Sequence, residues 1–343
     1  MIVRRFLLGL GACALAAAFA ACGGGGSTTS ITTIIPGSPA PSPTPAGTTF
    51  VALGDDAAVG IGTNVCGTTL PSTPCPSSAT IGGTPLTVNG VAVKGYAQTF
   101  AQHLSSLHSS QEFFPVIAGV TGSLVGAVPV SSPTPANDEL DNASQIGSLP
   151  GIASGAAGRT DRLTISFFAG INDVVDAYFS GACALSAGTL TGTGNPTNAA
   201  PCSAHGTTLP VSTAAPRSGS LYNAYSAVFT DLKSLKPYAL IVVTTPDLSR
   251  YPYFSTNAAT KLSASQSSTL SSDVQLANAA LQAAAADSGL KFALLDLYTA
   301  AANQPGFYSP LAFSSDGFHF SEPGYANVEG LMEAALTATY PSF

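Results

Sequence analysis

Five short apolar runs alternate with segments of helical periodicity, and this alternation restricts the fold more than any other feature of the chain. The runs are rich in β-branched and aromatic residues, and most end at Gly or Pro, as buried strands do. Strands that alternate with helices favour a parallel sheet with right-handed crossovers and helices on both faces. No internal repeat or second core is evident. The expected strands are 48–54, 113–118, 163–169, 239–245 and 291–297, and the expected helices are 96–107, 221–235, 264–287 and 323–337.

Polar residues whose side chains could take part in catalysis or binding follow several of these strands. The carboxyl ends of parallel strands share one edge of a sheet, and ligands bind at that edge. The sequence therefore predicts a site there, with a loop near the C-terminus adding a carboxylate and an imidazole. The segments concerned are Gly54-Asp55-Asp56, Gly122, Gly170-Ile171-Asn172-Asp173 and Asp316-Gly317-Phe318-His319.

In these four segments, and in their order, the chain resembles the SGNH hydrolases, also called GDSL esterases and lipases. The resemblance covers about residues 48–340, and the segment Ser321-Glu322-Pro323-Gly324-Tyr325 supplies the family's usual context for the His. It implies a flavodoxin-like three-layer α/β sandwich of about five parallel strands. It also implies a carboxylester hydrolase that acts on a small-molecule, lipid or carbohydrate ester without a cofactor or metal.

The resemblance assigns roles by position. The family's nucleophilic Ser falls on Asp56, whose backbone N–H also belongs to the oxyanion hole. The other oxyanion donors fall on Gly122, or Gly119 in a different register of the turn, and on the side chain of Asn172. The base falls on His319, and the carboxylate that orients it falls on Asp316. Acyl transfer needs such a base, a carboxylate to fix its tautomer, and donors aimed at a developing oxyanion.

Asp56 replaces the family's Ser, and three hypotheses for the site remain open. In the first, the site still hydrolyses esters, with Asp56 as a base for water or as a nucleophile. Attack by a carboxylate on an ester is uphill, because it expels a far more basic alkoxide. Activation of water is less demanding, but a carboxylate with the ordinary pKa of about 3.9 is a weak base.

The second hypothesis is attack by Asp56 on an sp³ carbon that carries a good leaving group. His319 would then activate water to cleave the alkyl ester formed on Asp56. The sequence contains no Trp and shows no aromatic pattern that would indicate a halide site.

The third hypothesis is a pseudoenzyme that binds a ligand at the cell surface without turning it over. Asp56 would pair with His319 and raise its pKa by opposite charge. One oxygen of the Asp56 carboxylate would also occupy the oxyanion hole. Both effects oppose serine-type chemistry.

The low charge of the chain argues against a nucleic-acid partner. Only 8% of its residues are charged and its net charge is -7, whereas binding to phosphates needs clustered Lys and Arg. A metal site is not indicated either, because the four His are scattered and no Cys-x-x-Cys spacing occurs. The oligomeric state is not indicated by the sequence.

The N-terminus predicts export. Arg4 and Arg5 precede an apolar segment, residues 6–20, that is short for a membrane span and ends in small residues before Cys22. This pattern resembles a bacterial lipoprotein signal, with a signal peptide of residues 1–21 and a lipid anchor on Cys22. Residues 22–47 are rich in Gly, Ser, Thr and Pro and are expected to be a tether. The chain is therefore expected at the bacterial cell envelope, with full secretion as the alternative.

Four further cysteines lie in two Gly-, Pro-, Ser- and Thr-rich insertions, near 62–95 and 180–218, within a hydrolase domain of residues 48–343. Of the three possible pairings we expect the local one, Cys66–Cys75 and Cys183–Cys202, because each bond would close one insertion. In an oxidising compartment each disulfide would contribute roughly 2–4 kcal/mol.

Overall fold

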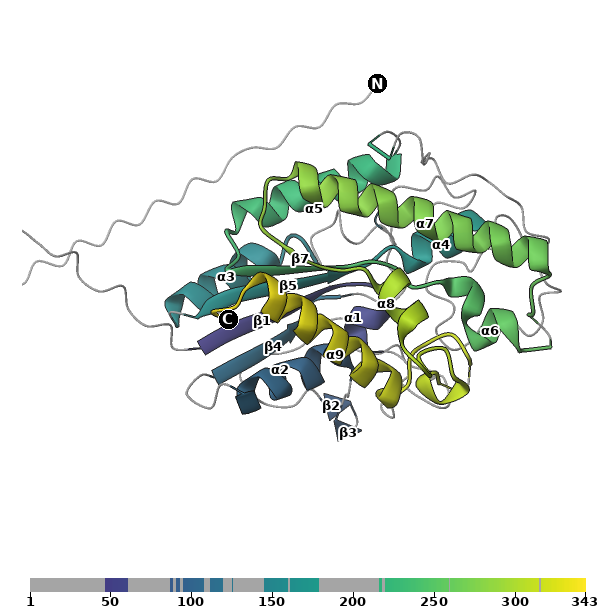
Figure 1. The fold of residues 1–343 in the computed structure, drawn as a ribbon. Helices are drawn as coiled ribbons and strands as arrows, with labels where there is room; N and C mark the ends of the chain where they lie inside the picture. Colours follow the sequence, from purple (N-terminus) through teal and green to yellow (C-terminus); the bar gives the residue numbers. More distant parts are fainter. Residues whose placement is uncertain are drawn as a thin grey trace, which may run out of the picture. The chain divides into compact units, whose positions relative to one another are not determined.

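A five-stranded parallel sheet forms the centre of the fold, with strand order β4-β1-β5-β6-β7 (Figure 1). Each strand appears where the apolar runs predict one. The central strand β1 pairs with β4 on one side and with β5 on the other, so the chain changes direction across the sheet at β1. This is the flavodoxin-like order, and it confirms the predicted fold class. The strands are β1 (Gly47–Gly54), β4 (Glu112–Ile117), β5 (Arg162–Phe168), β6 (Ala239–Val243) and β7 (Ala293–Leu295).

The computed structural model describes parts of one unit of the chain, Pro43–Phe343. The residues described are 47–60, 87–88, 91–92, 95–107, 112–119, 125, 145–159, 161–178, 216–217, 220–258, 260–314 and 316–343. The expected signal peptide, tether, lipid anchor and disulfides fall on other residues. What the sequence indicates for Cys22, Cys66, Cys75, Cys183 and Cys202 therefore stays a prediction.

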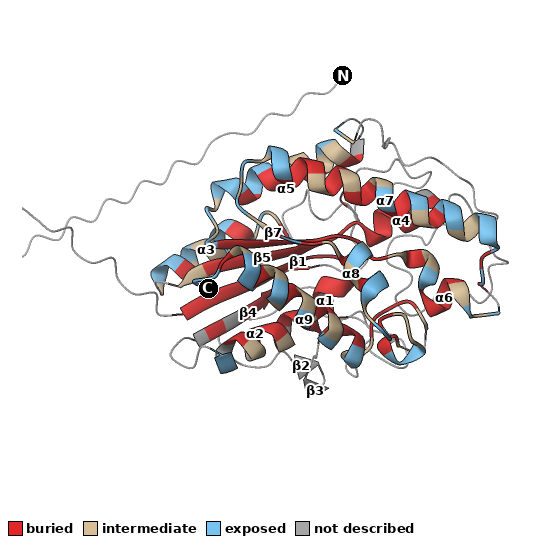
Figure 2. Ribbon diagram, in the orientation of Figure 1, coloured by how far each residue is buried: buried red, intermediate tan, exposed pale blue. Residues whose placement is uncertain are grey.

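Helices cover both faces of the sheet. In Figure 1, α5 (Ser220–Ser234) and α7 (Ala264–Asp287) lie on one side of the strands, whereas α2 (Tyr96–Leu107) and α9 (Glu322–Thr339) lie on the other. The three central strands β1, β5 and β6 are accordingly buried along almost their whole length (Figure 2). Burial on both faces is why their sequences are continuously apolar rather than alternating.

The sequence predicts a helical or irregular segment that ends at Gly158, and α3 (Leu149–Gly158) lies there. Three shorter helices were not predicted: α4 (Ile171–Tyr178), α6 (Pro252–Ser255) and α8 (Leu297–Asn303). The insertion expected near 62–95 is not entirely loop, because β2 (Thr87–Val88) and β3 (Val91–Ala92) form an antiparallel pair there. The last strand is also shorter than predicted, since the side chain of Asp296 caps α8 by accepting from the backbone N–H of Thr299.

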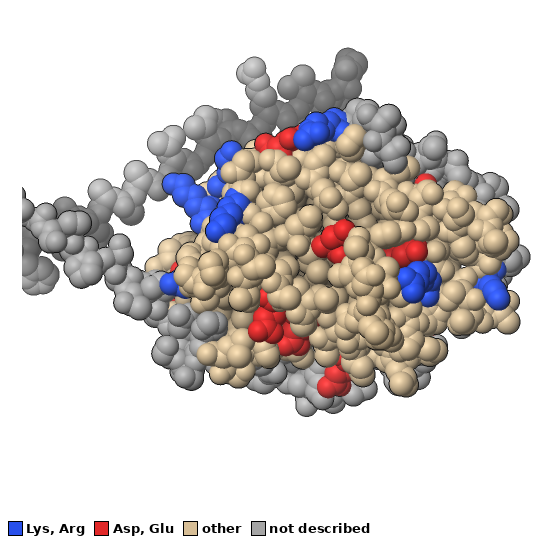
Figure 3. Space-filling view, in the orientation of Figure 1, with Lys and Arg blue, Asp and Glu red and all other residues tan. Residues whose placement is uncertain are grey.

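Charged side chains are few and scattered on the face shown in Figure 3. Among the helices that the structure describes, none combines the length and the apolar character needed to cross a membrane.

Candidate active site

The turn after β1 is built around Gly54. Its φ of +137° is a conformation that side-chain-bearing residues rarely adopt, and a Cβ here would lie 1.8 Å from the carbonyl oxygen of Phe168. The side chain of Gln145 binds both backbone polar groups of the same residue, Gly54. Its Oε1 accepts from the N–H of Gly54 at 3.1 Å, and its Nε2 donates to the carbonyl of Gly54 at 3.1 Å. The end of β1 is therefore fixed by sterics and by a fully buried carboxamide.

Asp55 and Asp56 start the short helix α1 (Asp56–Val59). Asp55 is the N-cap, and its Oδ1 accepts from the backbone N–H of Ala57 at 3.3 Å. Burial raises the pKa of Asp55 well above its usual value, and the neighbouring Asp56 carboxylate raises it further. Burial thus favours the neutral form of Asp55.

Asn172 reaches Asp56 from the next strand of the sheet. Gly170 follows β5 with a φ of +110°, and α4 begins directly after it, so Asn172 lies in the first turn of that helix. Its side-chain Nδ2 donates to Oδ2 of Asp56 at 3.1 Å. The pairing of β1 with β5 therefore brings together two side chains that are 116 residues apart.

Asp316 and His319 form a dyad within one tight turn. Oδ1 of Asp316 accepts from the hydroxyl of Ser314 at 2.6 Å and from the backbone N–H groups of Phe318 and His319 at 2.8 and 3.0 Å. Its Oδ2 lies 2.6 Å from Nδ1 of His319. An Asp that bonds the backbone two and three residues ahead is a turn-forming motif, and here it aims the carboxylate at the ring.

The two members of the dyad shift each other's pKa. Burial alone would raise the pKa of Asp316, but the charge and hydrogen bond of His319 outweigh it and lower that pKa to about 2. For His319 the effects have the opposite sign. Burial alone would lower its pKa, but the charge and hydrogen bond of Asp316 raise it by more, and the charges of Asp56 and Asp55 raise it further. The net result is that the pKa of His319 is raised, so its imidazolium form persists to higher pH than that of an ordinary histidine.

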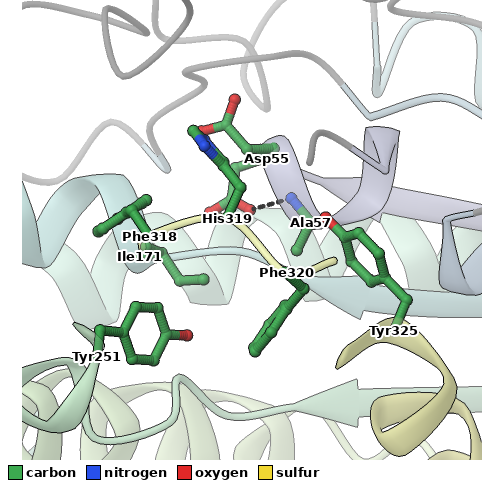
Figure 4. Close-up of a pocket in the computed structure, with 9 residues that line it drawn as sticks. Asp55, Ala57, Ile171, Tyr251, Phe318, His319, Phe320 and Tyr325 are labelled. Atoms are coloured by element: carbon green, nitrogen blue, oxygen red, sulfur yellow. Dashed lines mark hydrogen bonds between the residues drawn. The ribbon is translucent and has the colours of Figure 1, made fainter. Parts of the chain in front are cut away.

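A small pocket lies beside the imidazole (Figure 4). Nε2 of His319 is buried and makes no hydrogen bond within the described part of the chain, so Asp56 acts on the ring through its charge. The residues Asp56, Asn172 and His319 are only 5, 8 and 4% exposed, so charges here are poorly screened. The pocket is lined by Asp55, Asp56, Ala57, Ile171, Tyr251, Phe318, His319, Phe320 and Tyr325.

The segment after His319 packs the dyad against the fold. Ser321 caps α9, because its Oγ accepts from the backbone N–H of Gly324. A Cβ at Gly324 would lie 2.0 Å from the carbonyl oxygen of Ala312, so this close approach requires glycine. Tyr325 is buried and packs against the ring of Phe320. The sequence pattern at 321–325 thus has a structural cause.

The structure brings together four of the predicted site residues: Asp56, Asn172, Asp316 and His319. Gly122 lies outside the described residues. The alternative, Gly119, already donates its N–H to the carbonyl of Ala52 at 3.0 Å, which directs that group into the sheet and away from a substrate. Within the described part of the chain, no group of three or more His, Cys, Asp or Glu is arranged to hold a metal ion.

Sequence reasoning missed two supporting side chains. One is Gln145, at the end of β1. The other is Asp173, whose two carboxylate oxygens accept from the backbone N–H of Val125 at 3.1 and 3.0 Å. Asp173 stands beside Asn172 in the motif, and that position was the available signal. For Gln145 the sequence offers none.

We expect Asp56→Asn to lower the pKa of His319, because the amide removes a negative charge that raises it. An NMR titration of the imidazole C–H signals would measure the shift, with His319→Gln used to assign the signal among the four histidines. An unchanged pKa in Asp56→Asn would contradict the electrostatic coupling of the two residues.

Comparison with known proteins finds similar solved structures but no matching family model and no matching curated protein. LAE5, an α/β hydrolase from the metagenome of Lake Arreo, is 13% identical over 86% of this chain and 98% of its own, with a TM-score of 0.46. Phospholipase A1 from Streptomyces albidoflavus is 14% identical over 84% of this chain and 100% of its own, with a TM-score of 0.43. A variant of the acetyl xylan esterase Axe2 from Geobacillus stearothermophilus is 12% identical over 85% of this chain and 95% of its own, with a TM-score of 0.42. The chain is thus similar to solved hydrolases, two of which are named for ester substrates or activities.

Proposed function

We propose that the chain is an exported carboxylester hydrolase of the SGNH type in which Asp56 slows turnover. The observation that carries this proposal is the His319–Asp316 dyad at the pocket that Asp56 also lines, where Nε2 of His319 makes no hydrogen bond to any described residue. His319 is assigned as the base and Asp316 as the group that orients it. Asn172 and the backbone N–H groups of Asp56 and Gly122 are assigned as oxyanion donors.

Asp56 opposes the reaction in two ways. Its Oδ2 accepts the Asn172 amide, which an ester oxyanion would otherwise use. Its charge also raises the pKa of His319, and a base is useful only in its deprotonated form. Hydrolysis is therefore slow at neutral pH and rises as His319 loses its proton.

A second candidate is a ligand-binding module without turnover, and the hydrogen bond from Asn172 to Asp56 favours it. In this case the carboxylate is a permanent occupant of the oxyanion site. The ligand would then be recognised by the rest of the pocket, which carries the aromatic side chains of Tyr251, Phe318, Phe320 and Tyr325.

The site is proposed to act outside the cytoplasm. The support is the N-terminal sequence: a signal peptide of residues 1–21, a lipid anchor on Cys22, which would hold the protein at a membrane, and a tether to residue 47. Full secretion without the anchor is the alternative. Disulfides Cys66–Cys75 and Cys183–Cys202 belong to the same proposal, because they form in oxidising compartments.

The test is hydrolysis of p-nitrophenyl acetate and butyrate by the native protein and by His319→Ala between pH 6 and pH 9. An enzyme should show a slow rate that depends on His319 and increases above the raised pKa of this residue. Equal rates in the two proteins, with the ester still bound, would favour the binding module. A fast rate that survives Asp56→Ala would contradict control of the site by position 56.

A further inference from the structure

The side-chain amide of Asn172, which is assigned as an oxyanion donor, donates to the carboxyl group of Asp56 rather than to a substrate. Nδ2 of Asn172 lies 3.1 Å from Oδ2 of Asp56, within the range for a donor that stabilises an oxyanion. In a serine hydrolase such a donor faces a carbonyl of the substrate. Here the amide would instead stabilise a tetrahedral intermediate formed at the carboxyl carbon of Asp56.

His319, the assigned base, lines the same pocket as the carboxyl group of Asp56. His319 Nε2 is unbonded within the described residues and lies at the pocket that Asp56 lines, while Nδ1 is held by Asp316 at 2.6 Å. Asp56 and His319 line the same pocket, so a water molecule activated there by His319 would lie in the pocket that also holds the carboxyl group of Asp56. The parts needed to cleave an ester are thus arranged around an ester that Asp56 itself would form.

Formation of that ester would also switch the base on. Asp56 in its charged form is one of the groups that raise the pKa of His319. An alkyl ester of Asp56 carries no charge, so this contribution disappears when the ester forms. The first step therefore moves His319 towards the neutral imidazole that the second step needs.

We propose that the native site hydrolyses neutral alkyl esters of sulfonic acids, and related alkylating compounds whose leaving group departs as a stable anion, through an alkyl ester of Asp56. The proposal rests on the roles of Asn172, His319 and Asp316 in the proposed function. It changes the substrate from one attacked at an acyl carbon to one attacked at an sp³ carbon.

The reaction has two steps, alkylation of Asp56 and hydrolysis of the alkyl ester, and each bond formed is matched by a bond broken. In the first, an oxygen of the Asp56 carboxylate bonds to the alkyl carbon, the bond from that carbon to the sulfonate oxygen breaks, and the sulfonate leaves as an anion. In the second, His319 takes a proton from water, and the hydroxide adds to the carboxyl carbon of Asp56 while Asn172 donates to the oxyanion. The intermediate collapses, the alcohol leaves with the proton from His319, and the Asp56 carboxylic acid loses its proton to solvent.

The side chains that line the pocket favour a neutral substrate over an anionic one. Its described residues include Asp55 and Asp56 but no Lys or Arg, so an anionic substrate gains no ion pair there. Ile171, Tyr251 and Phe318 provide apolar surface for a short alkyl chain. A sulfonate leaves without protonation, so no further acid is required. A halide site, which the sequence does not indicate, is also unnecessary.

The test uses ethyl p-nitrobenzenesulfonate with the native protein, His319→Ala and Asp56→Asn, each checked for folding by circular dichroism. His319→Ala should accumulate one ethyl group on the peptide that carries Asp56, because loss of the base slows release by about 100-fold. The native protein should turn the substrate over and, in water enriched in heavy oxygen, gain the label in the Asp56 carboxylate. Asp56→Asn should form no ester and should not turn over.

The absence of an ethyl group on Asp56 in a folded His319→Ala protein would overturn this inference. So would turnover by the native protein without label in Asp56, since water would then have attacked the substrate directly. Esterase activity of Asp56→Ser distinguishes failure of the alkyl-ester mechanism from failure of the proposed esterase function. If the Ser variant is active and the native protein is not alkylated, the further inference fails and the proposed function stands. If His319→Ala does not change the Ser variant, the proposed function fails.

Discussion

Asp56→Ser should raise the hydrolysis of p-nitrophenyl acetate at pH 7 by about 100-fold over the native protein, well short of the roughly million-fold effect of a complete triad. The substitution supplies a hydroxyl beside the His319–Asp316 dyad and removes a negative charge. It also frees Nδ2 of Asn172, which now donates to Asp56 at 3.1 Å, for a substrate oxyanion. The pKa of His319 should fall at the same time, so more of the imidazole is available as a base.

Two variants control this result. Asp56→Ala also removes the charge but supplies no nucleophile, so its rate should remain within about tenfold of the native rate. His319→Ala in the Ser background should return the rate to that of Asp56→Ala. A Ser variant no faster than the Ala variant would mean that these side chains do not act together.

Gly54→Ala should lower the free energy of unfolding by at least about 3 kcal/mol. The new Cβ would lie 1.8 Å from the carbonyl oxygen of Phe168, a backbone atom of the neighbouring strand that cannot rotate away. The φ of +137° adds strain for any residue with a Cβ. Relief requires the end of β1 to separate from β5, which would also displace Asp56 from Asn172.

Gly330→Ala is the matched control, because it makes the same chemical change in the interior of α9. A Cβ at Gly330 meets nothing within 4 Å. Ala is favoured over Gly inside a helix, so this variant should be more stable than the native protein by about 0.5–1 kcal/mol. Urea unfolding followed by circular dichroism would measure both variants. A Gly54→Ala protein as stable as the native one would contradict the tight approach of the turn to Phe168.

Most strands and long helices could be predicted from the sequence because their apolar residues recur with a regular period. The helices 96–107 and 264–287 were predicted with the bounds that α2 and α7 have. In α7 the start is fixed locally, since Ser263 and Gln266 form a reciprocal capping box. The short helices α4 and α8 were missed because each follows a strand almost without a break, and the apolar run of the strand masks the helical spacing.

Residues of the candidate site could be predicted from the sequence only where they are close together in the chain or follow a strand. The carboxamide side chains that hold the strand ends could not be predicted from either signal. Gln145 bonds the backbone N–H and C=O of Gly54 from 91 residues away, and Asn278 does the same for Thr245, just after β6, from 33 residues away. Such side chains replace a missing strand neighbour for one residue. Their role depends on position in space, and neither spacing nor composition records it.

The different sequence separations within the site have a consequence for the order in which it forms. Asp316 and His319 are three residues apart, so their contact closes a very short loop. Asp56 and Asn172 are 116 residues apart, and they meet only after β1 and β5 have paired in register. Closing long loops costs more entropy and is slower. During refolding the dyad should therefore reach its native geometry early, while contact between Asp56 and Asn172 should coincide with completion of the sheet. Activity regained over time would then report on global folding, whereas the imidazole signal of His319 would report on a single turn.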